Sequence, residues 1–140
     1  WHCGDFGNLA VIEALQAVKP LRGVYGNIDG IEIRQQFPEV NRFACEGVEV
    51  LMIHIGGYPN KYSPLAKQEI LTCPPKLFIS GHSHILKVQY DKQFQLIHLN
   101  PGAAGLYGWQ TVRTMLRFEI EAGEIKNLEI IELARSTTGN

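Results

Sequence analysis

The chain has 140 residues, of which 45% are hydrophobic and 19% are charged, a composition typical of one globular domain with its own core. Its 13 basic and 14 acidic side chains give a formal charge of -1, so there is no strong signal for nucleic acid as a partner. No apolar run reaches the roughly 18 residues of a membrane-spanning helix, and we expect no segment to cross a membrane.

The three cysteines, Cys3, Cys45 and Cys73, show neither a CxxC nor a zinc-finger spacing. Their odd number favours reduced thiols in a cytoplasmic protein over a disulfide framework. Because there is no repeat, linker or low-complexity tract, we expect residues 1–140 to form a single domain. The chain starts at Trp1 inside a strand pattern, so we also expect the first strand and helix of the domain to precede it.

The first quarter of the chain predicts two short strands around one helix. Residues 1–3 end a strand that leaves through Gly4-Asp5, and residues 21–25 form a second strand that ends at Gly26-Asn27. Asn8 is a predicted cap of the helix between them. The helical spacing predicts that its buried stripe consists of Val11, Ala14, Leu15 and Val18.

A loop and a hairpin follow. Residues 32–38 are polar and are expected to form a loop. The segments 40–44 and 48–54 are predicted to pair around Glu46-Gly47, and the second strand of this hairpin ends at His54.

The second half of the chain begins with a helix and a buried strand. Proline is favoured at the first helical position, so Ser63-Pro64 predicts a helix start. The strand over residues 76–79 stops at Gly81, and His82 and His84 follow on a loop. The helix is expected to bury Leu65, Ala66, Ile70 and Leu71. Strands are then predicted over 85–90, 94–99, 111–120 and 124–133, the last with a bulge or with both faces covered.

Several predicted strand ends carry a side chain that can bind a metal, and open α/β sheets place their ligands at strand ends of this kind. Imidazole together with carboxylate suits Mn²⁺, Fe, Zn²⁺ or Ni²⁺ better than Mg²⁺ or Ca²⁺. A carboxylate can also bridge two cations, which can clamp both oxygens of a phosphoryl displacement. The candidate ligands are Asp5, Asn27, His54, His82 and His84.

Each candidate also has an ordinary structural explanation. Asp5 can be a turn or capping residue, and Gly26-Asn27 consists of common turn formers. A single histidine that closes a strand is more often a hydrogen-bonded structural residue. The repetition of a strand, a glycine and a ligand-type residue along the chain favours a metal centre over these alternatives.

The order Gly-Asp, Gly-Asn, His and Gly-His-x-His resembles that of the calcineurin-like metallophosphoesterases. The turn Asn100-Pro101-Gly102 and the length are similar to their small bacterial branch, the YfcE-type phosphodiesterases, and the match runs from His2 to about Trp109. This resemblance implies an α/β fold of the αββα type, a four-layer sandwich in which two mixed β-sheets lie face to face with flanking helices.

The resemblance also implies a mechanism and a set of catalytic residues, Asp5, Asn27 and His54. Asp5 would bridge two divalent cations, while Asn27, His54 and His82 complete the shell of one and His84 binds the other. Mn²⁺ is the first choice, with Ni²⁺, Zn²⁺ or Fe as alternatives. The implied activity is hydrolysis of phosphoesters, chiefly diesters, by a metal-bound hydroxide.

Two features depart from the family pattern. The family's first strand bears Asp-x-His, which supplies further ligands to the cation at His84, and we expect this strand before Trp1. Ile28 stands where many relatives have a histidine, and isoleucine cannot assist a leaving group, so acidic leaving groups should be favoured. Asp29 is expected to orient a metal ligand through a hydrogen bond.

Other functions stay open at this point. The chain can be a non-catalytic scaffold or protein-binding module of the same fold, similar to the retromer scaffold subunit, and an exposed apolar patch on the β-rich half would favour this. A single structural zinc is disfavoured because it needs no asparagine ligand. The expected partner is a small phosphoester substrate, and a homo-oligomer is compatible with the sequence. Four aromatic residues are candidates for lining a pocket, although core or surface packing is the favoured role for each: Tyr58, Tyr62, Tyr107 and Trp109.

Overall fold

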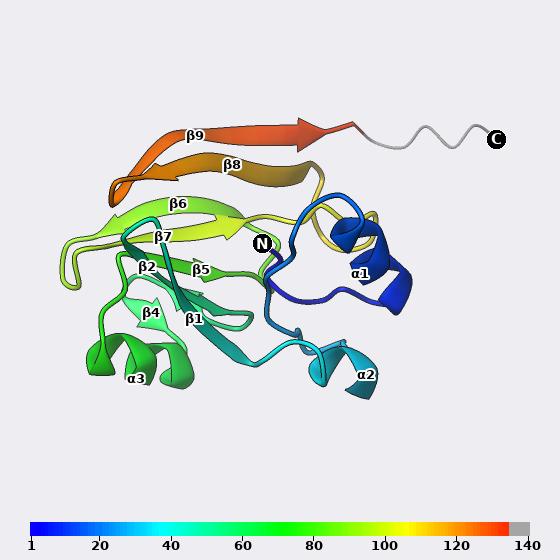
Figure 1. The fold of residues 1–140 in the computed structure, drawn as a ribbon, viewed down its shortest axis with the longest axis horizontal. Helices are drawn as coiled ribbons and strands as arrows, with labels where there is room; N and C mark the ends of the chain where they lie inside the picture. The colour runs from blue at the N-terminus through cyan, green and yellow to red at the C-terminus, as the bar shows by residue number, and fades with distance from the viewer. Residues whose placement is uncertain (135–140) are drawn as a thin grey trace.

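The computed structural model describes residues 1–134, and a five-stranded mixed sheet lies at its centre (Figure 1). Strands β2, β5 and β7 run parallel, and their hairpin partners β1 and β6 flank them in the antiparallel direction. The predicted α/β class with a mixed sheet is therefore confirmed. In spatial order the strands are β1 (Val40–Cys45), β2 (Val48–Ile53), β5 (Leu77–Ser80), β7 (Leu96–Pro101) and β6 (Leu86–Asp91).

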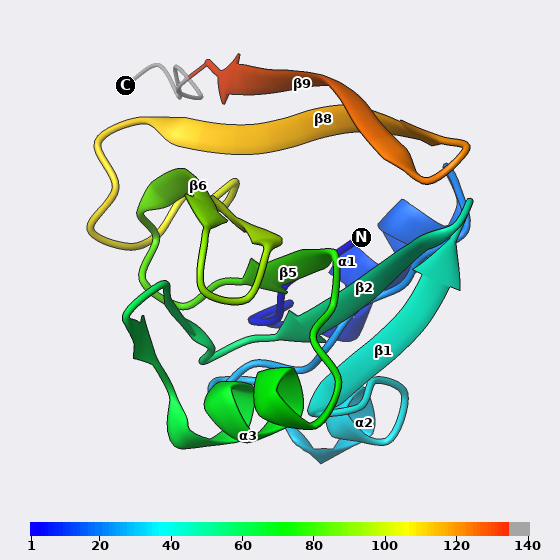
Figure 2. The ribbon, with the colours of Figure 1, turned by 90° about the vertical axis from the view of Figure 1, so that its left-hand side faces the viewer.

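Two layers cover the faces of this sheet (Figure 2). Helix α3 (Pro64–Thr72) packs on one face, where Ala66 and Ile70 are buried. The hairpin of β8 (Arg113–Glu121) and β9 (Glu124–Leu133) packs on the other face. The sequence predicts two mixed sheets, whereas this second layer is antiparallel, because within residues 1–134 β8 and β9 pair only with each other.

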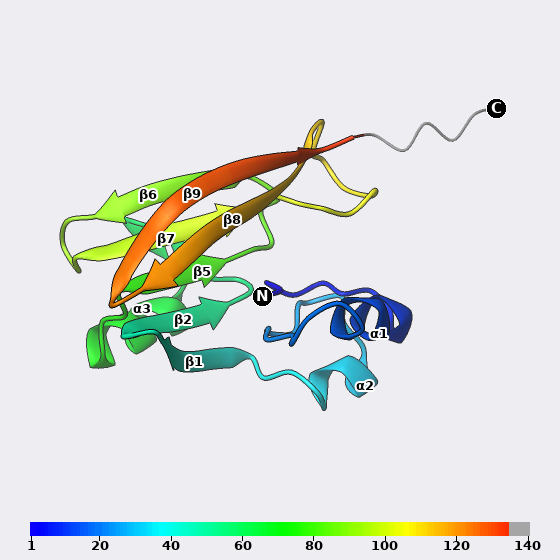
Figure 3. The same ribbon diagram turned by 45° about the horizontal axis from the view of Figure 1, so that its top comes forward.

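The first part of the chain lies at the carboxyl ends of the parallel strands (Figure 3). It contains helices α1 (Leu9–Gln16) and α2 (Ile31–Arg34), which share a small apolar core. A short hairpin precedes α3, and its strands β3 (Gly57–Tyr58) and β4 (Lys61–Tyr62) have two residues each. No helix in the described residues is long and apolar enough to cross a bilayer.

Two predicted strands and one predicted loop differ from the structure. The strands predicted at residues 1–3 and 21–25 are reduced to a single parallel bridge between His2 and Gly23, since the two short segments meet at only one position. The loop predicted over residues 32–38 begins inside helix α2, because tertiary packing of an apolar side chain overrides the polar composition of the segment.

Helix α1 begins where the sequence predicts but does not bury the predicted stripe. The Asn8 side chain accepts a hydrogen bond from the Val11 N–H at 3.1 Å and caps the helix. All four stripe residues are exposed and only Ile12 is buried, so the stripe was wrong. The helix ends before Val18, which therefore falls outside the helical phase on which the prediction rests.

Strand β9 contains the bulge that its imperfect alternation predicts. Between the pairs Arg117 with Glu129 and Glu119 with Lys126, β9 has two residues opposite one residue of β8. Asn127 within this bulge has a φ of 52°, and asparagine tolerates that left-handed conformation better than most residues.

A buried histidine on β7 is held in one tautomer. His98 Nε2 lies 2.8 Å from the Ser80 hydroxyl, which donates its own proton to the Gly57 carbonyl at 3.0 Å. Nε2 therefore carries the histidine proton, and Nδ1 has no hydrogen-bond partner in the described part of the chain. Burial lowers the pKa of His98 to about 4, because a proton added at Nδ1 would be a buried charge without an acceptor.

The orientation of α3 predicts that two adjacent aliphatic residues, Ile70 and Leu71, contribute differently to stability. Replacing Ile70, which is 0% exposed, by alanine should lower the free energy of unfolding by about 2–5 kcal/mol through loss of apolar contacts and a cavity. Leu71→Ala is the matched control, since Leu71 is 59% exposed and should change stability by about 0.5 kcal/mol at most. Urea denaturation measures both changes, and equal losses of unfolding free energy would contradict the observed orientation of the helix. The exposure of Leu71 also shows that the prediction of its burial was wrong.

The buried, neutral state of His98 predicts that the folded protein is less stable in mild acid. The unfolded residue takes up a proton near pH 6.5 and the folded one only near pH 4, so the free energy of unfolding should fall as the pH drops through this window. The loss for this residue is about 3 kcal/mol.

His98→Gln keeps a donor for Ser80 but does not titrate, so this variant should lose that part of the pH dependence. The pKa of His2, also lowered to about 4 by burial, contributes with the same sign in both proteins and cancels in the comparison. Urea unfolding at a series of pH values measures the difference, and identical pH slopes would refute the assignment.

Candidate metal centre

Four of the five predicted ligands meet beside the carboxyl ends of β2 and β5. Asp5, His54 and His82 each offer one donor atom, and these atoms lie within 4.8 Å of one another. Asn27 joins them, because its Oδ1 lies 3.0 Å from His54 Nε2 and 2.9 Å from His82 Nδ1. The fifth residue, His84, lies outside this group.

His54 is held so that one known ring nitrogen faces the group. Its Nδ1 lies 2.6 Å from the carbonyl oxygen of Cys3, and since a carbonyl can only accept, Nδ1 carries the proton. Nε2 therefore presents a lone pair to Asp5 Oδ2, at 3.3 Å, and to Asn27 Oδ1. Three electron-rich atoms that face one another repel, and a cation among them relieves the repulsion. The donor set therefore fits a divalent metal with mixed oxygen and nitrogen ligands.

Glycines let the ligand-bearing loops lie directly against one another. A Cβ atom on Gly26 would lie 2.0 Å from Asp5 Oδ1, and a Cβ on Gly4 would lie 2.6 Å from His54 Nδ1. Gly4 also has a φ of 94°, which side chains disfavour. Each of these glycines thus precedes one candidate ligand in the sequence and leaves space for a different candidate ligand in the fold.

Three predicted ligands have left-handed backbone conformations. The φ angles of Asp5, His82 and His84 are 59°, 65° and 59°. Such conformations are uncommon outside glycine and cost on the order of 1 kcal/mol or more each. Other residues of this kind, such as Glu46 and Ala122, lie in hairpin turns, where this geometry is ordinary. Strained backbone at three candidate ligands supports a functional role for these loops.

Asp29 supports a loop of the site rather than a histidine. Its buried carboxylate accepts hydrogen bonds from the N–H groups of Gly26 at 2.7 Å and Gly7 at 3.0 Å. Arg34, which the sequence analysis missed, donates to the carbonyl oxygens of Asp29 at 2.7 Å and Asn27 at 3.2 Å. No motif marks Arg34, because it acts through backbone carbonyls.

His84 lies on the wall of a separate cavity of about 340 Å³. Its Nδ1 is 2.9 Å from Gln110 Oε1, a contact that the sequence does not predict. Trp109, one of the aromatic residues considered for a pocket, lines the same cavity. Tyr62 does not have this role, because its hydroxyl donates to Asp91 at 2.6 Å.

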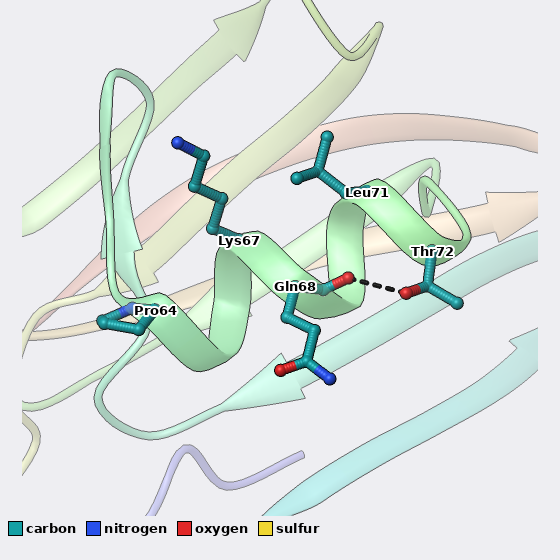
Figure 4. Close-up of a pocket in the computed structure, with 5 residues that line it drawn as sticks. All are labelled: Pro64, Lys67, Gln68, Leu71 and Thr72. Atoms are coloured by element: carbon teal, nitrogen blue, oxygen red, sulfur yellow. Dashed lines mark hydrogen bonds between the residues drawn. The ribbon is translucent and has the colours of Figure 1, made fainter.

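A second hollow lies on the outer side of α3 and carries no metal-binding group (Figure 4). It has a volume of about 520 Å³, and its only charged side chain is that of Lys67. The hollow is lined by Pro64, Lys67, Gln68, Leu71 and Thr72. The strand ends are therefore the better candidate for a functional site.

Comparisons with known proteins agree with the resemblance drawn from the sequence. The model of the calcineurin-like phosphoesterase superfamily domain matches residues 1–123. A search of curated proteins gave no match.

Solved structures share the fold at low sequence identity. A novel archaeal phosphodiesterase superposes with a TM-score of 0.72 at 20% identity, over 94% of this chain and 81% of its own. Wild-type Vps29 from Entamoeba histolytica in complex with zinc gives 0.64 at 19% identity, over 93% and 77%. A predicted phosphoesterase from Streptococcus pneumoniae gives 0.62 at 18% identity, over 79% and 62%.

The geometry predicts that His54 is required for cation binding at this centre. Mn²⁺ present at 100 times its Kd should raise the free energy of unfolding of the wild-type protein by about 2.7 kcal/mol. His54→Ala should lose most of this gain, since the variant lacks the nitrogen that the Cys3 carbonyl orients.

Glu124→Gln is the matched control, because it removes an exposed carboxylate at the start of β9, outside the candidate ligands, and should keep the full gain from Mn²⁺. Thermal unfolding with and without Mn²⁺ measures the effect. Full stabilisation of the His54→Ala protein by Mn²⁺ would show that the assignment is incorrect.

Proposed function

The chain belongs to the calcineurin-like phosphoesterase superfamily, and from this premise we propose that it is a metal-dependent phosphoesterase that acts on phosphodiesters. One observation chiefly supports the proposal: donor atoms of Asp5, Asn27, His54 and His82 converge, and the lone pair of His54 Nε2 is directed among them. The likeness in fold to an archaeal phosphodiesterase agrees with it.

We propose two divalent cations, Mn²⁺ in preference to Ni²⁺, Zn²⁺ or Fe. Asp5, Asn27, His54 and His82 would hold one of them, and Asp5 and His84 would contribute to holding the other. When bound, such a pair supplies an activated water and neutralises phosphate charge. This suits a chain whose formal charge is only -1.

The residues around the centre favour a substrate with a good leaving group. Ile28 is 63% exposed, and its N–H donates to Asp5 Oδ1 at 3.3 Å. Its backbone therefore helps to orient Asp5, while its side chain has no proton to give to a departing alkoxide. Arg34 directs its guanidinium at loop carbonyls rather than at the centre. Esters of acidic alcohols or phenols should therefore react best.

We propose a small phosphoester as the substrate. We also propose that the protein acts in the cytoplasm. The three cysteines are free, which supports a reducing compartment. The proposal needs no macromolecular partner, because the ligands all come from one chain.

The alternative is a scaffold of the same fold, and the likeness to Vps29 supports it. Large apolar side chains are exposed on the β-rich half of the chain, among them Tyr90 at 56% and Ile130 at 55%. Exposed apolar side chains of this kind suit protein binding. An activity assay distinguishes the two functions.

The test is hydrolysis of bis-p-nitrophenyl phosphate in the presence of Mn²⁺ or Ni²⁺. We expect release of p-nitrophenol, and much slower hydrolysis of a dialkyl phosphate because Ile28 cannot protonate its leaving group. Asp5→Asn should lower kcat/KM on the order of 100-fold or more, which corresponds to ~2.7 kcal/mol.

Glu124→Gln is the matched control, since it removes an exposed carboxylate at the start of β9 and should leave the rate unchanged. Absence of turnover with every metal, by a folded wild-type protein that binds Mn²⁺, would refute the enzyme and favour the scaffold.

A further inference from the structure

Gln110 holds His84 in a defined protonation state. Gln110 Oε1 lies 2.9 Å from His84 Nδ1, and Gln110 Nε2 donates to the carbonyl oxygens of Gly105 and Tyr107, both at 3.0 Å. Carbonyls can only accept, so the amide nitrogen must face them and the amide oxygen must face the histidine. His84 Nδ1 therefore carries the proton and donates it to Gln110.

This arrangement leaves Nε2 of His84 with its lone pair, as the ring nitrogen available to a cation. His54 reaches the same tautomer through the backbone carbonyl of Cys3. For His84 the acceptor is a side chain whose other end binds the loop over residues 105–110. One amide group therefore joins a predicted metal ligand to this loop.

The loop also packs directly against the His84 ring. A Cβ atom on Gly108, which has a φ of 133°, would lie 2.4 Å from His84 Nδ1 and 2.3 Å from Gln110 Oε1. Only glycine lets the backbone approach this closely. Tyr107 and Trp109 on either side of Gly108 are each 90% exposed, and Trp109 lines the same cavity as His84.

We propose that Gln110 is a positioning residue that fixes His84 as the Nδ1–H tautomer, directs Nε2 to a cation, and ties the aromatic loop to that ligand. The role toward a cation rests on the function proposed above, whereas the tautomer and the loop contact do not. The loop places Trp109 on the wall of the 340 Å³ cavity that His84 also lines.

The test is the ¹⁵N NMR spectrum of the histidine side chains in the metal-free protein, at a pH well above the ordinary histidine pKa of about 6.5. In the wild-type protein we expect His84 to be protonated at Nδ1. Gln110→Leu removes the acceptor and both donors, so His84 should become a mixture of tautomers and the amide signals of residues 105–109 should shift.

Gln110→Glu separates the two roles of the side chain. Its carboxylate still accepts from Nδ1–H, so the tautomer should be kept, but it cannot donate to the two carbonyls and the loop signals should shift as in Gln110→Leu. Gln68→Leu, a change of the same type on the outer side of α3, is the control and should alter neither readout (Figure 4). Binding of the weaker of two Mn²⁺ ions should fall about 10–100-fold in Gln110→Leu and recover in Gln110→Glu.

A wild-type His84 protonated at Nε2, or an unchanged tautomer in Gln110→Leu, would overturn the proposal. If Gln110→Leu does not fold, the spectra of the wild-type and Gln110→Glu proteins still decide it. Because the spectra need no metal and no turnover, a failed phosphoesterase assay would refute the proposed function and leave the tautomer result standing.

Discussion

The hydrogen bond between the Cys3 carbonyl and His54 Nδ1 is the constraint on which the candidate site depends. It joins the segment before Asp5 to the end of β2, and it determines which ring nitrogen faces inward. If that proton were on Nε2, His54 could donate to Asn27 and Asp5 and would be a satisfied structural histidine. Because the Cys3 carbonyl accepts the Nδ1–H on the outer side, only acceptors face the inner side, and a cation held there would relieve their repulsion.

The register of the sheet brings the other imidazole to the same place. Parallel pairing sets Ile53 opposite Ser80, so β2 and β5 stop at the same level. The N–H of Gly81 then donates to the His54 carbonyl at 2.9 Å, which continues the ladder by one residue before the chain turns to His82. Burial of both strands fixes this register, since a shift by one residue would exchange the side chains that pack on the two covered faces of the sheet. The precision of the ligand positions thus comes from the apolar core.

The sequence predicts the ends of β2 and β5 well, because a buried apolar run that stops at polar residues or glycine is a local signal, and His54 and His82 follow such runs. The separate position of His84 could not be predicted, since spacing does not say which way a loop turns. The apolar spacing around Val18 indicated a buried face, but periodicity cannot show whether a neighbour covers it. The Cys3 carbonyl has no sequence signature at all, because every residue carries one.

The close packing of the loops at Gly4 and Gly26 would affect the size of the ion that the candidate site can hold. Ca²⁺ takes about six to eight oxygen ligands at roughly 2.3–2.6 Å and requires a shell that can widen. In this fold the Asp5 carboxylate lies directly beside Gly26, and the ring of His54 lies directly beside Gly4. Gly4 and Gly26 would therefore limit how far a shell that contains Asp5 and His54 could widen around an ion.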